Sequence, residues 1–327
     1  MGMDSMDIAN RELPAPTPTM YPGLRHGLSG LWHGLCRAVL AALALVGLAT
    51  AALAGPNLVQ NGTFSGFNAG ANTAANSCNF GSTGTAAGMA QLSNCDLPNW
   101  WSTGVPSGGN YTFILPAPYT QGSSNFTTTN GSSLGLRGPG NTNGAVIPVP
   151  PSGASQFLAT DGAFQQSYTY TTITGLIVGY TYNITFNMAA SQQAGSQFNG
   201  PTSDWWQVGL STGTAGCSIA GNNTGSPPGC QPNTGTTTSA ITPTIVLPTT
   251  GAGQGFSGWV GEEITLVASA ANEVLWFFGE STALQAQPPF LLLDGVSLTV
   301  PEPPAYGVLM VALLGLLGVR RAYRRKG

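Results

Sequence analysis

The spacing of apolar residues between positions 55 and 300 limits most strongly what this chain can fold into. No segment there repeats its apolar residues every 3.6 positions, as an amphipathic helix would. Short β-branched and aromatic runs are instead separated by Gly and Asn, and apolar and polar residues alternate along residues 180–188 as in a half-buried strand. We therefore expect an all-β body with long Gly/Ser/Asn-rich loops. Strands are predicted near residues 57–60, 156–159, 164–172, 180–189, 205–210, 241–247, 258–268, 273–279 and 290–300.

The stretch from residue 68 to residue 149 is rich in Gly and shows little strand pattern beyond residues 111–115. It has no apolar set of its own that would make a second core. We therefore assign residues 55–300 to a single β-sandwich.

The N-terminal 54 residues carry the features of a secretory signal. Residues 38–54 form an apolar run that follows Arg37 and ends in Ala52-Leu53-Ala54, a small-residue pattern suited to signal peptidase. The run is shorter than the about 20 residues of a spanning helix. We expect a signal helix cleaved after Ala54. The segment before it is long, so either Met1 or Met20 is the start.

The C-terminal 27 residues have three parts in a fixed order. Pro301-Glu302-Pro303 precedes the apolar run 306–319, and Arg320 and Arg321 open a basic cluster. Because basic residues stay in the cytoplasm, the body is expected outside the membrane. This tail resembles the PEP-CTERM sorting signal of Gram-negative bacteria that make extracellular polysaccharide. The resemblance implies recognition by an exosortase, a membrane cysteine protease, with cleavage near the tripeptide; an ordinary tail anchor is the alternative.

Charge is nearly absent between residues 55 and 300. Arg137 is the single basic residue of that stretch, which has no Lys and no His. Nucleic-acid binding therefore has no electrostatic basis. Both histidines, His26 and His33, precede the expected cleavage site, so the mature protein has no Ser-His-Asp or Cys-His arrangement. Eight acids remain: Asp96, Asp161, Asp204, Glu262, Glu263, Glu273, Glu280 and Asp294.

Four cysteines remain after removal of Cys36 with the signal peptide. Exported chains meet an oxidising compartment, and the natural pairing joins neighbours in sequence. We expect Cys78–Cys95 and Cys217–Cys230, with other pairings left open.

Several segments together resemble the galactose-binding-like jelly roll of carbohydrate-binding modules. Residues 57–64 (NLVQNGTF) look like its first strand, and residues 97–101 (LPNWW) like its early P-x-W element. Residues 175–182 (GLIVGYTY) are similar to its G-L-x-x-G-x-x-Y turn, and residues 291–298 (LLLDGVSL) to its final strand. The resemblance implies a jelly-roll β-sandwich.

One departure concerns a structural calcium ion. Such modules often carry Glu after the N-G-x-F phenylalanine, and this chain has Ser65 there. Hard cations take several oxygen ligands. Asp294 is a candidate calcium ligand; the alternative is a turn or strand-end carboxylate bonded to backbone amides. No other cofactor is expected.

Sugars are recognised by aromatic faces framed by a few polar groups. Adjacent strand residues point to opposite sides, so one indole of each Trp pair is expected in the core and one outside. Core or loop packing is an equally weighted interpretation. The candidate sugar-binding platforms are Trp100, Trp101, Trp205, Trp206 and Trp259.

These observations favour a non-catalytic exported protein of the cell surface or extracellular matrix that associates with extracellular polysaccharide. A purely structural coat protein or adhesin is one alternative. The other is a glycosidase that uses carboxylates alone, for which two acids must flank one bond. Glu262 and Glu263 are neighbours on a predicted strand and face opposite ways, so they do not form such a pair.

Overall fold

The computed structural model describes the greater part of residues 55–300. The segments it describes are residues 55–66, 68–69, 78–79, 95–102, 111–122, 126–127, 133–164, 166–195, 201–212, 236–248, 254–282 and 288–300. The predicted signal peptide and sorting tail lie outside them. Within these segments, no helix is long and apolar enough to cross a bilayer.

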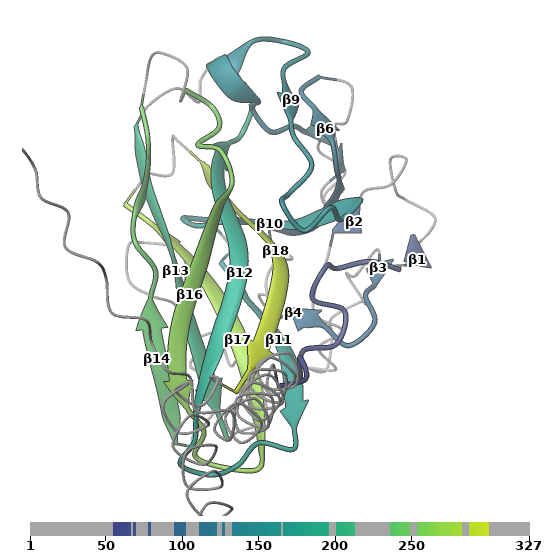
Figure 1. Cartoon of the computed structure of the whole chain (residues 1–327). Helices are drawn as coiled ribbons and strands as arrows, with labels where there is room; N and C mark the ends of the chain where they lie inside the picture. The colour runs from purple at the N-terminus through teal and green to yellow at the C-terminus, as the bar shows by residue number, and fades with distance from the viewer. Residues whose placement is uncertain are drawn as a thin grey trace, which may run out of the picture. The chain divides into compact units, whose positions relative to one another are not determined.

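Two antiparallel sheets form the body (Figure 1). Sheet I runs in the order β16 (Val260–Val267), β12 (Thr181–Gln192), β18 (Pro289–Thr299), β10 (Gln156–Asp161), β5 (Thr112–Pro116) and β2 (Cys78–Asn79). Sheet II runs in the order β14 (Thr237–Ile241), β13 (Thr202–Ser211), β17 (Asn272–Ser281), β11 (Tyr168–Thr174) and β4 (Trp101–Ser102), with β15 (Ile245–Leu247) also paired to β13.

The chain crosses between the sheets at almost every step. It passes from β10 in sheet I to β11 in sheet II, back to β12, and on to β13 and β14 in sheet II. It then crosses to β16, to β17 and finally to β18. These repeated crossings give a jelly-roll sandwich, and the expected fold class is confirmed.

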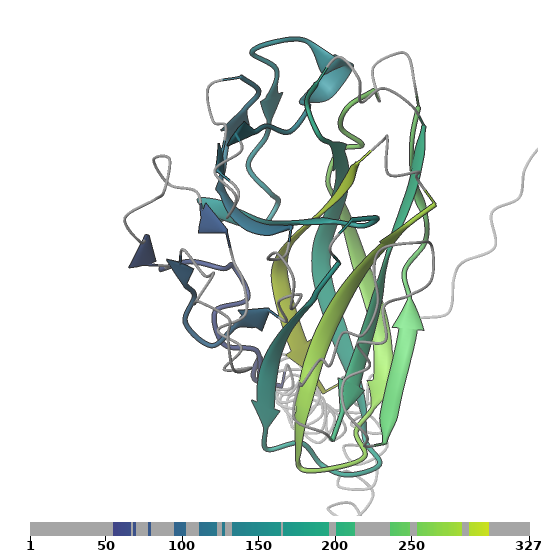
Figure 2. The same ribbon diagram turned by 180° about the vertical axis from the view of Figure 1, so that it is seen from behind.

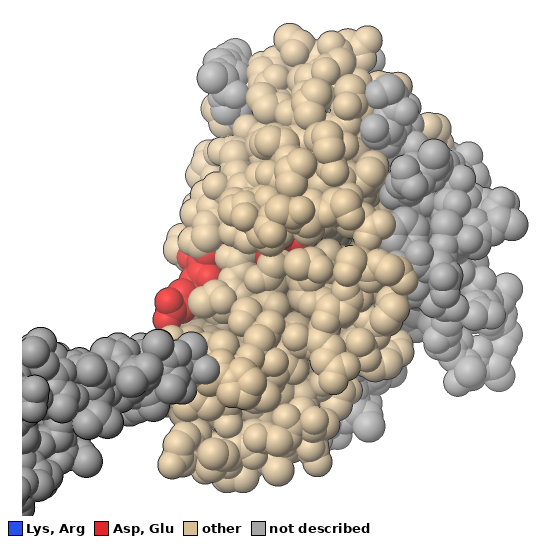
Figure 3. All heavy atoms as spheres, turned by 45° about the vertical axis from the view of Figure 1, so that its right-hand side comes forward, with Lys and Arg blue, Asp and Glu red and all other residues tan. Residues whose placement is uncertain are grey.

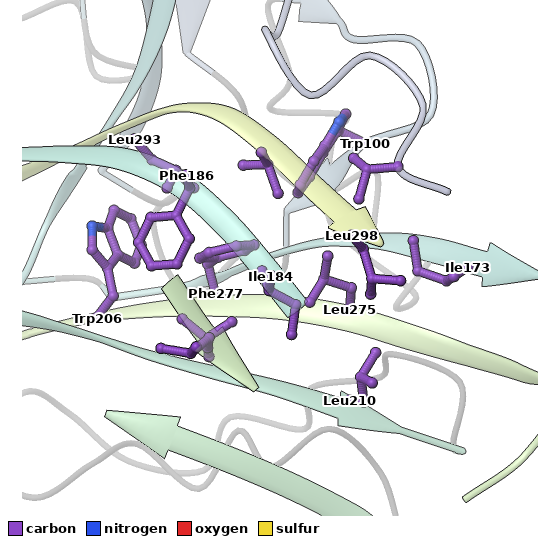
Figure 4. Packing of buried hydrophobic residues seen from close by; sticks show 14 of the residues in the cluster. Trp100, Ile173, Ile184, Phe186, Trp206, Leu210, Leu275, Phe277, Leu293 and Leu298 are labelled. Atoms are coloured by element: carbon purple, nitrogen blue, oxygen red, sulfur yellow. The ribbon is translucent and has the colours of Figure 1, made fainter. Parts of the chain in front are cut away.

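The main core fills the space between the sheets. Alternation along β12 points Tyr182, Ile184 and Phe186 inward, as the period of two predicted. Phe277 of sheet II meets Phe186 edge to face at 5.3 Å and Trp206 at 6.0 Å between ring centroids. Figure 4 shows these rings packed between the two sheets. Each such side chain contributes about 1.5–3 kcal/mol by leaving water.

A second core lies on the other face of sheet I. Phe113, Phe157 and Phe290 are buried there beneath Tyr119 and Ile147. This is why β18 reads as a continuous apolar run rather than an alternating one. The residues that cover this core come from β6 (Tyr119–Thr120), which pairs with β9 (Val146–Ile147), and from β8 (Ser133–Leu134), which pairs with β7 (Phe126–Thr127). The same stretch of the chain also contains the pair β1 (Asn68–Ala69) with β3 (Cys95–Asp96) and the 3-10 turn η1 (Pro139–Asn141).

One predicted strand is wrong. Residues 57–60 form no strand. The Asn57 Oδ1 accepts the N–H groups of Val59 and Leu298, each at 3.0 Å, and Asn61 adopts a left-handed backbone with φ 54°. These side-chain bonds replace a ladder between strands.

Candidate functional site

The outer face of sheet II carries a row of aromatic residues from three neighbouring strands. Trp101 of β4 lies opposite Tyr170 of β11, which lies opposite Trp276 of β17. Residues directly opposite in a sheet point to the same side. Figure 2 turns this sheet toward the viewer.

Trp101 and Tyr170 form a stacked pair at the edge of this row. Their ring centroids are 5.9 Å apart and their planes differ by 25°. Trp101 is 45% exposed, and Tyr170 is half-buried, which raises the pKa of its hydroxyl. The pair therefore offers a supported, nearly flat apolar surface to solvent.

Trp100 has the opposite environment, as strand alternation predicted. It is buried against Phe64, with ring centroids 4.9 Å apart. Its Nε1 donates to the carbonyls of Gln60 and Asn61 at 3.1 and 2.9 Å. Trp100 is therefore a core residue and no sugar platform.

Trp276 occupies the middle of the face. Its ring lies against Gly209, where an added Cβ would come within 2.2 Å of a ring carbon. Its Nε1 donates to the Ser211 hydroxyl at 2.8 Å. Beside it, the rings of Tyr168 and Phe278 stack on each other with centroids 4.5 Å apart. Trp276, Tyr168 and Phe278 are all buried. Together with Tyr170, these residues were missed in the sequence, although Tyr168/Tyr170 and Trp276/Phe278 each show the spacing of two that shares one face.

Trp205 lies further along the same face. It is directly opposite Glu280, and both side chains are partly buried. Burial raises the pKa of the Glu280 carboxyl, and a hydrogen bond from Trp205 partly offsets the rise. Its neighbour Trp206 points inward and is fully buried. The structure thus brings Trp101 and Trp205 to one face and places Trp206 in the core.

Trp259 is not on this face. It packs against Phe157 at 5.5 Å and Phe256 at 6.3 Å, beside the second core. Its Nε1 donates to the Pro148 carbonyl at 3.0 Å. These contacts favour a packing role for Trp259.

Asp294 is buried within β18. It accepts hydrogen bonds from the Ser152 hydroxyl and from the Gly295 amide. Burial outweighs these bonds and raises the pKa of the Asp294 carboxyl to about 6. The described segments hold no group of three or more His, Cys, Asp or Glu side chains set to bind a metal. Ser65, the departure noted above, bonds within its own turn to Asn61.

Two further acids are buried where the sheets meet. Asp161 ends β10, and Asp204 lies in β13 opposite Ser281. Gly162 packs against Ser281, since a Cβ there would lie 3.2 Å from that side chain. Burial raises the pKa of both carboxyls to about 7, and the charge of Asp204 adds to the rise at Asp161. Each carboxyl keeps one oxygen without a hydrogen-bond partner.

The glutamates do not form a catalytic pair. Glu262 and Glu263 point to opposite sides of β16, as expected from their adjacency. Glu273 is buried and accepts bonds from the amide and hydroxyl of Ser269 at 3.2 and 2.6 Å. Its carboxylate therefore caps a turn. The acids of the described segments with the largest pKa shifts, Asp161 and Asp204, are shielded from any polymer substrate by their burial.

Arg137 carries no positive charge to the surface. Its Nη2 donates to the Gly195 carbonyl at 2.6 Å and its Nε to the Gln193 carbonyl at 3.3 Å. Burial lowers the pKa of its guanidinium. The face drawn in Figure 3 shows a few acidic atoms and no basic one among its described residues.

The predicted disulfides remain predictions. The backbone of Cys78 lies in β2 and that of Cys95 in β3, which belong to different sheets. Cys217 and Cys230 lie outside the described residues.

No protein-family model matches the chain, and no curated protein shows significant similarity to it. Among solved structures, a CBM61 module in complex with β-1,4-galactotriose is 10% identical, with a TM-score of 0.30 over 75% of this chain and 99% of the module. The K1 cleaved adhesin domain of Lys-gingipain from Porphyromonas gingivalis is 11% identical, with a TM-score of 0.32 over 63% and 92%. The CBM22-1–CBM22-2 tandem of Paenibacillus barcinonensis Xyn10C is 11% identical, with a TM-score of 0.27 over 76% and 99%. At these TM-scores the similarity assigns neither a ligand nor an activity.

Proposed function

We propose that this chain is a non-catalytic, exported surface protein that binds uncharged extracellular polysaccharide through the Trp101–Tyr170 pair. The observation that carries the proposal is the exposed Trp101 indole, stacked on Tyr170 at 5.9 Å. A flat apolar ring held in place by a second ring loses little conformational entropy on binding. Such a surface suits the apolar face of a pyranose.

Charge supports an uncharged ligand. The stretch from residue 55 to residue 300 has one basic residue, and its guanidinium is bound to two backbone carbonyls. Glu280 stands on the same face as the Trp101–Tyr170 pair. A polyanion would meet repulsion there and no counter-charge, so polymers of uronic acids or sulfated sugars are poor ligands.

Export and sorting complete the proposal. Signal peptidase removes residues 1–54, and an exosortase recognises Pro301, Glu302 and Pro303 ahead of the apolar run and the arginine cluster. The protein is held in the inner membrane before processing and then resides at the cell surface, in the outer envelope or in the matrix of a Gram-negative bacterium. Intact masses of the protein from cells and from culture medium report both cleavages.

Binding is tested by retention of the full chain, in detergent, on insoluble neutral polysaccharides and on a uronate polymer. We expect retention on at least one neutral polymer and none on the uronate. Trp101→Ala should weaken binding by about tenfold, the loss typical of a central aromatic contact. Tyr180→Ala is the matched control, because Tyr180 is 52% exposed and lies in a turn away from this face. Retention that Trp101→Ala leaves unchanged would refute the assigned site, and no retention on any neutral polymer would leave a purely structural coat role.

A further inference from the structure

One end of the sandwich is built from two turns that meet where the chain leaves the body. β18 ends at Thr299, opposite Asn183 near the start of β12. The turn from β11 to β12 (residues 175–180) and the turn from β16 to β17 (residues 268–271) lie at this same end, since Thr181 is opposite Val267 and Thr174 is opposite Asn272. Figure 1 shows both turns at the lower end, toward which β18 also points.

The first of these turns exposes large apolar side chains at its tip. Ile177 is 51% exposed, Val178 60% and Tyr180 52%. Soluble proteins scatter single exposed apolar residues over their surfaces, but three within four positions form a patch. We call residues 175–180 the apolar tip.

The apolar tip is held rigidly. The Leu176 amide donates to the Ala271 carbonyl at 3.0 Å, and the Gly179 amide to the Ala268 carbonyl at 2.8 Å. The Ile177 amide donates to the Tyr182 hydroxyl at 2.8 Å. Leu176 is itself buried in the main core. The exposed side chains therefore extend from a braced turn, and their exposure is fixed by the fold.

Neither turn carries a charge. Residues 175–180 and 268–271 contain no Asp, Glu, Lys, Arg or His. The nearest acid along the chain, Glu273, is buried and turned toward Ser269. Contact of the two turns with a low-dielectric surface therefore has a small desolvation free energy, because no charged side chain of these turns loses its hydration.

The proposed membrane anchor follows the end of β18 closely in the sequence. Five residues, 301–305, join Val300 to the apolar run 306–319. An extended chain of that length spans at most about 20 Å. While the anchor is in the bilayer, the apolar tip is therefore within reach of the interfacial layer, where Tyr is enriched and aliphatic side chains insert favourably.

We propose that the apolar tip docks on the lipid bilayer that holds the anchor, with Ile177 and Val178 inserted among the headgroups and Tyr180 at the interface. The body then stands on this end, and the exposed Trp101 indole is left free to contact polysaccharide. This inference rests on the membrane anchoring in the proposed function and is independent of glycan binding.

The test uses the full chain in vesicles of phosphatidylethanolamine and phosphatidylglycerol, with a photoactivatable diazirine residue at one position. In three separate variants, the diazirine residue replaces Val178 in the tip, Val246 in β15, or Val308 in the apolar run. Val246 is the matched control, because it is also 60% exposed and lies away from the tip. Transfer of two half-exposed aliphatic side chains from water into the bilayer favours the docked state over the undocked state by roughly tenfold or more. We therefore expect the yield of lipid adducts at position 178 to exceed that at position 246 by about this factor.

Three other patterns of adducts would each overturn the docking of the tip on lipid. Lipid adducts at 308 without adducts at 178 would overturn the docking and leave the anchor intact. Adducts at neither position would remove the anchor and the docking together. Adducts from 178 to a second chain, in place of lipid, would show that the tip joins two copies and would also overturn the proposal.

A second set of variants tests the side chains without disturbing the fold. Ile177→Ser with Val178→Ser leaves the backbone bonds of the turn and the buried Leu176 in place. With the diazirine residue at position 180, this double variant should lose most of its lipid adducts. Ile241→Ser with Val246→Ser should keep them. Equal adduct yields from the two double variants would contradict insertion of the tip.

Discussion

Replacing Asp161 by Asn should make the protein less sensitive to rising pH. Asp161 is buried, and burial raises the pKa of its carboxyl from its ordinary value of 3.8 to about 7 in the folded chain. Because the folded pKa is the higher one, the native state binds more protons than the unfolded state between about pH 4 and pH 7. Stability is then greatest below pH 4, falls through that window, and levels off above it.

The magnitude follows from proton linkage. Between its unfolded and folded pKa values, each acid with a raised folded pKa lowers the free energy of unfolding by up to about 1.4 kcal/mol for every unit by which the pH rises. Asp204 titrates in the same window, with a pKa of about 7, and Asp294 follows with about 6. The three shifts have the same sign, so each acid contributes to the fall in stability as the pH rises. Asp161→Asn should remove roughly one acid's share of the slope and stabilise the protein at pH 8, where the native carboxylate is charged and buried.

Urea unfolding at intervals from pH 4 to pH 8, followed by Trp fluorescence, measures this directly. Glu263→Gln is the control for loss of a carboxylate at the surface, because Glu263 is exposed. Native stability that rises between pH 5 and pH 7, or an undiminished slope in Asp161→Asn, would refute the reasoning.

Two further substitutions probe the packing of sheet II and the core. Gly209→Ala should cost about 1–3 kcal/mol, because its Cβ would lie 2.2 Å from the Trp276 ring, whereas Gly261→Ala, with its nearest atom 3.9 Å away, should be close to neutral. Thermal unfolding of the two variants compares them, and equal midpoints would contradict the contact. Trp100→Phe should lower the free energy of unfolding more than Trp206→Phe. The first change removes the N–H donor of the Gln60 and Asn61 carbonyls, whereas the Trp206 Nε1 has no hydrogen-bond partner to lose. Urea midpoints that reverse this order would contradict the assigned hydrogen bonds.

Local pattern was sufficient for part of the fold. The alternation along residues 180–188 predicted β12 and its inward side chains, because the period of two depends on the strand alone. The same rule separated Trp100 from Trp101 and Trp206 from Trp205. Pattern predicted a strand at residues 57–60 wrongly, because the Asn57 side chain accepts the Val59 and Leu298 N–H groups that a strand would bond to backbone carbonyls.

The aromatic row of sheet II was beyond such rules. Trp101, Tyr170 and Trp276 meet because β4, β11 and β17 pair in one register, although more than a hundred positions separate the last two residues in the chain. Register between distant strands depends on the whole packing of the sandwich. The second core was missed for a related reason: β10 and β18 are apolar on both sides, and their sequence does not say what covers the outer one.

The central position of β18 has a consequence for how the chain matures. Among the described residues, β18 is the last strand along the chain, yet it lies between β12 and β10 and supplies side chains to both cores. A nascent chain cannot close either core until residues 289–299 have been synthesised. A chain cut short before residue 289 would therefore leave both aromatic interiors open to contact with neighbouring chains.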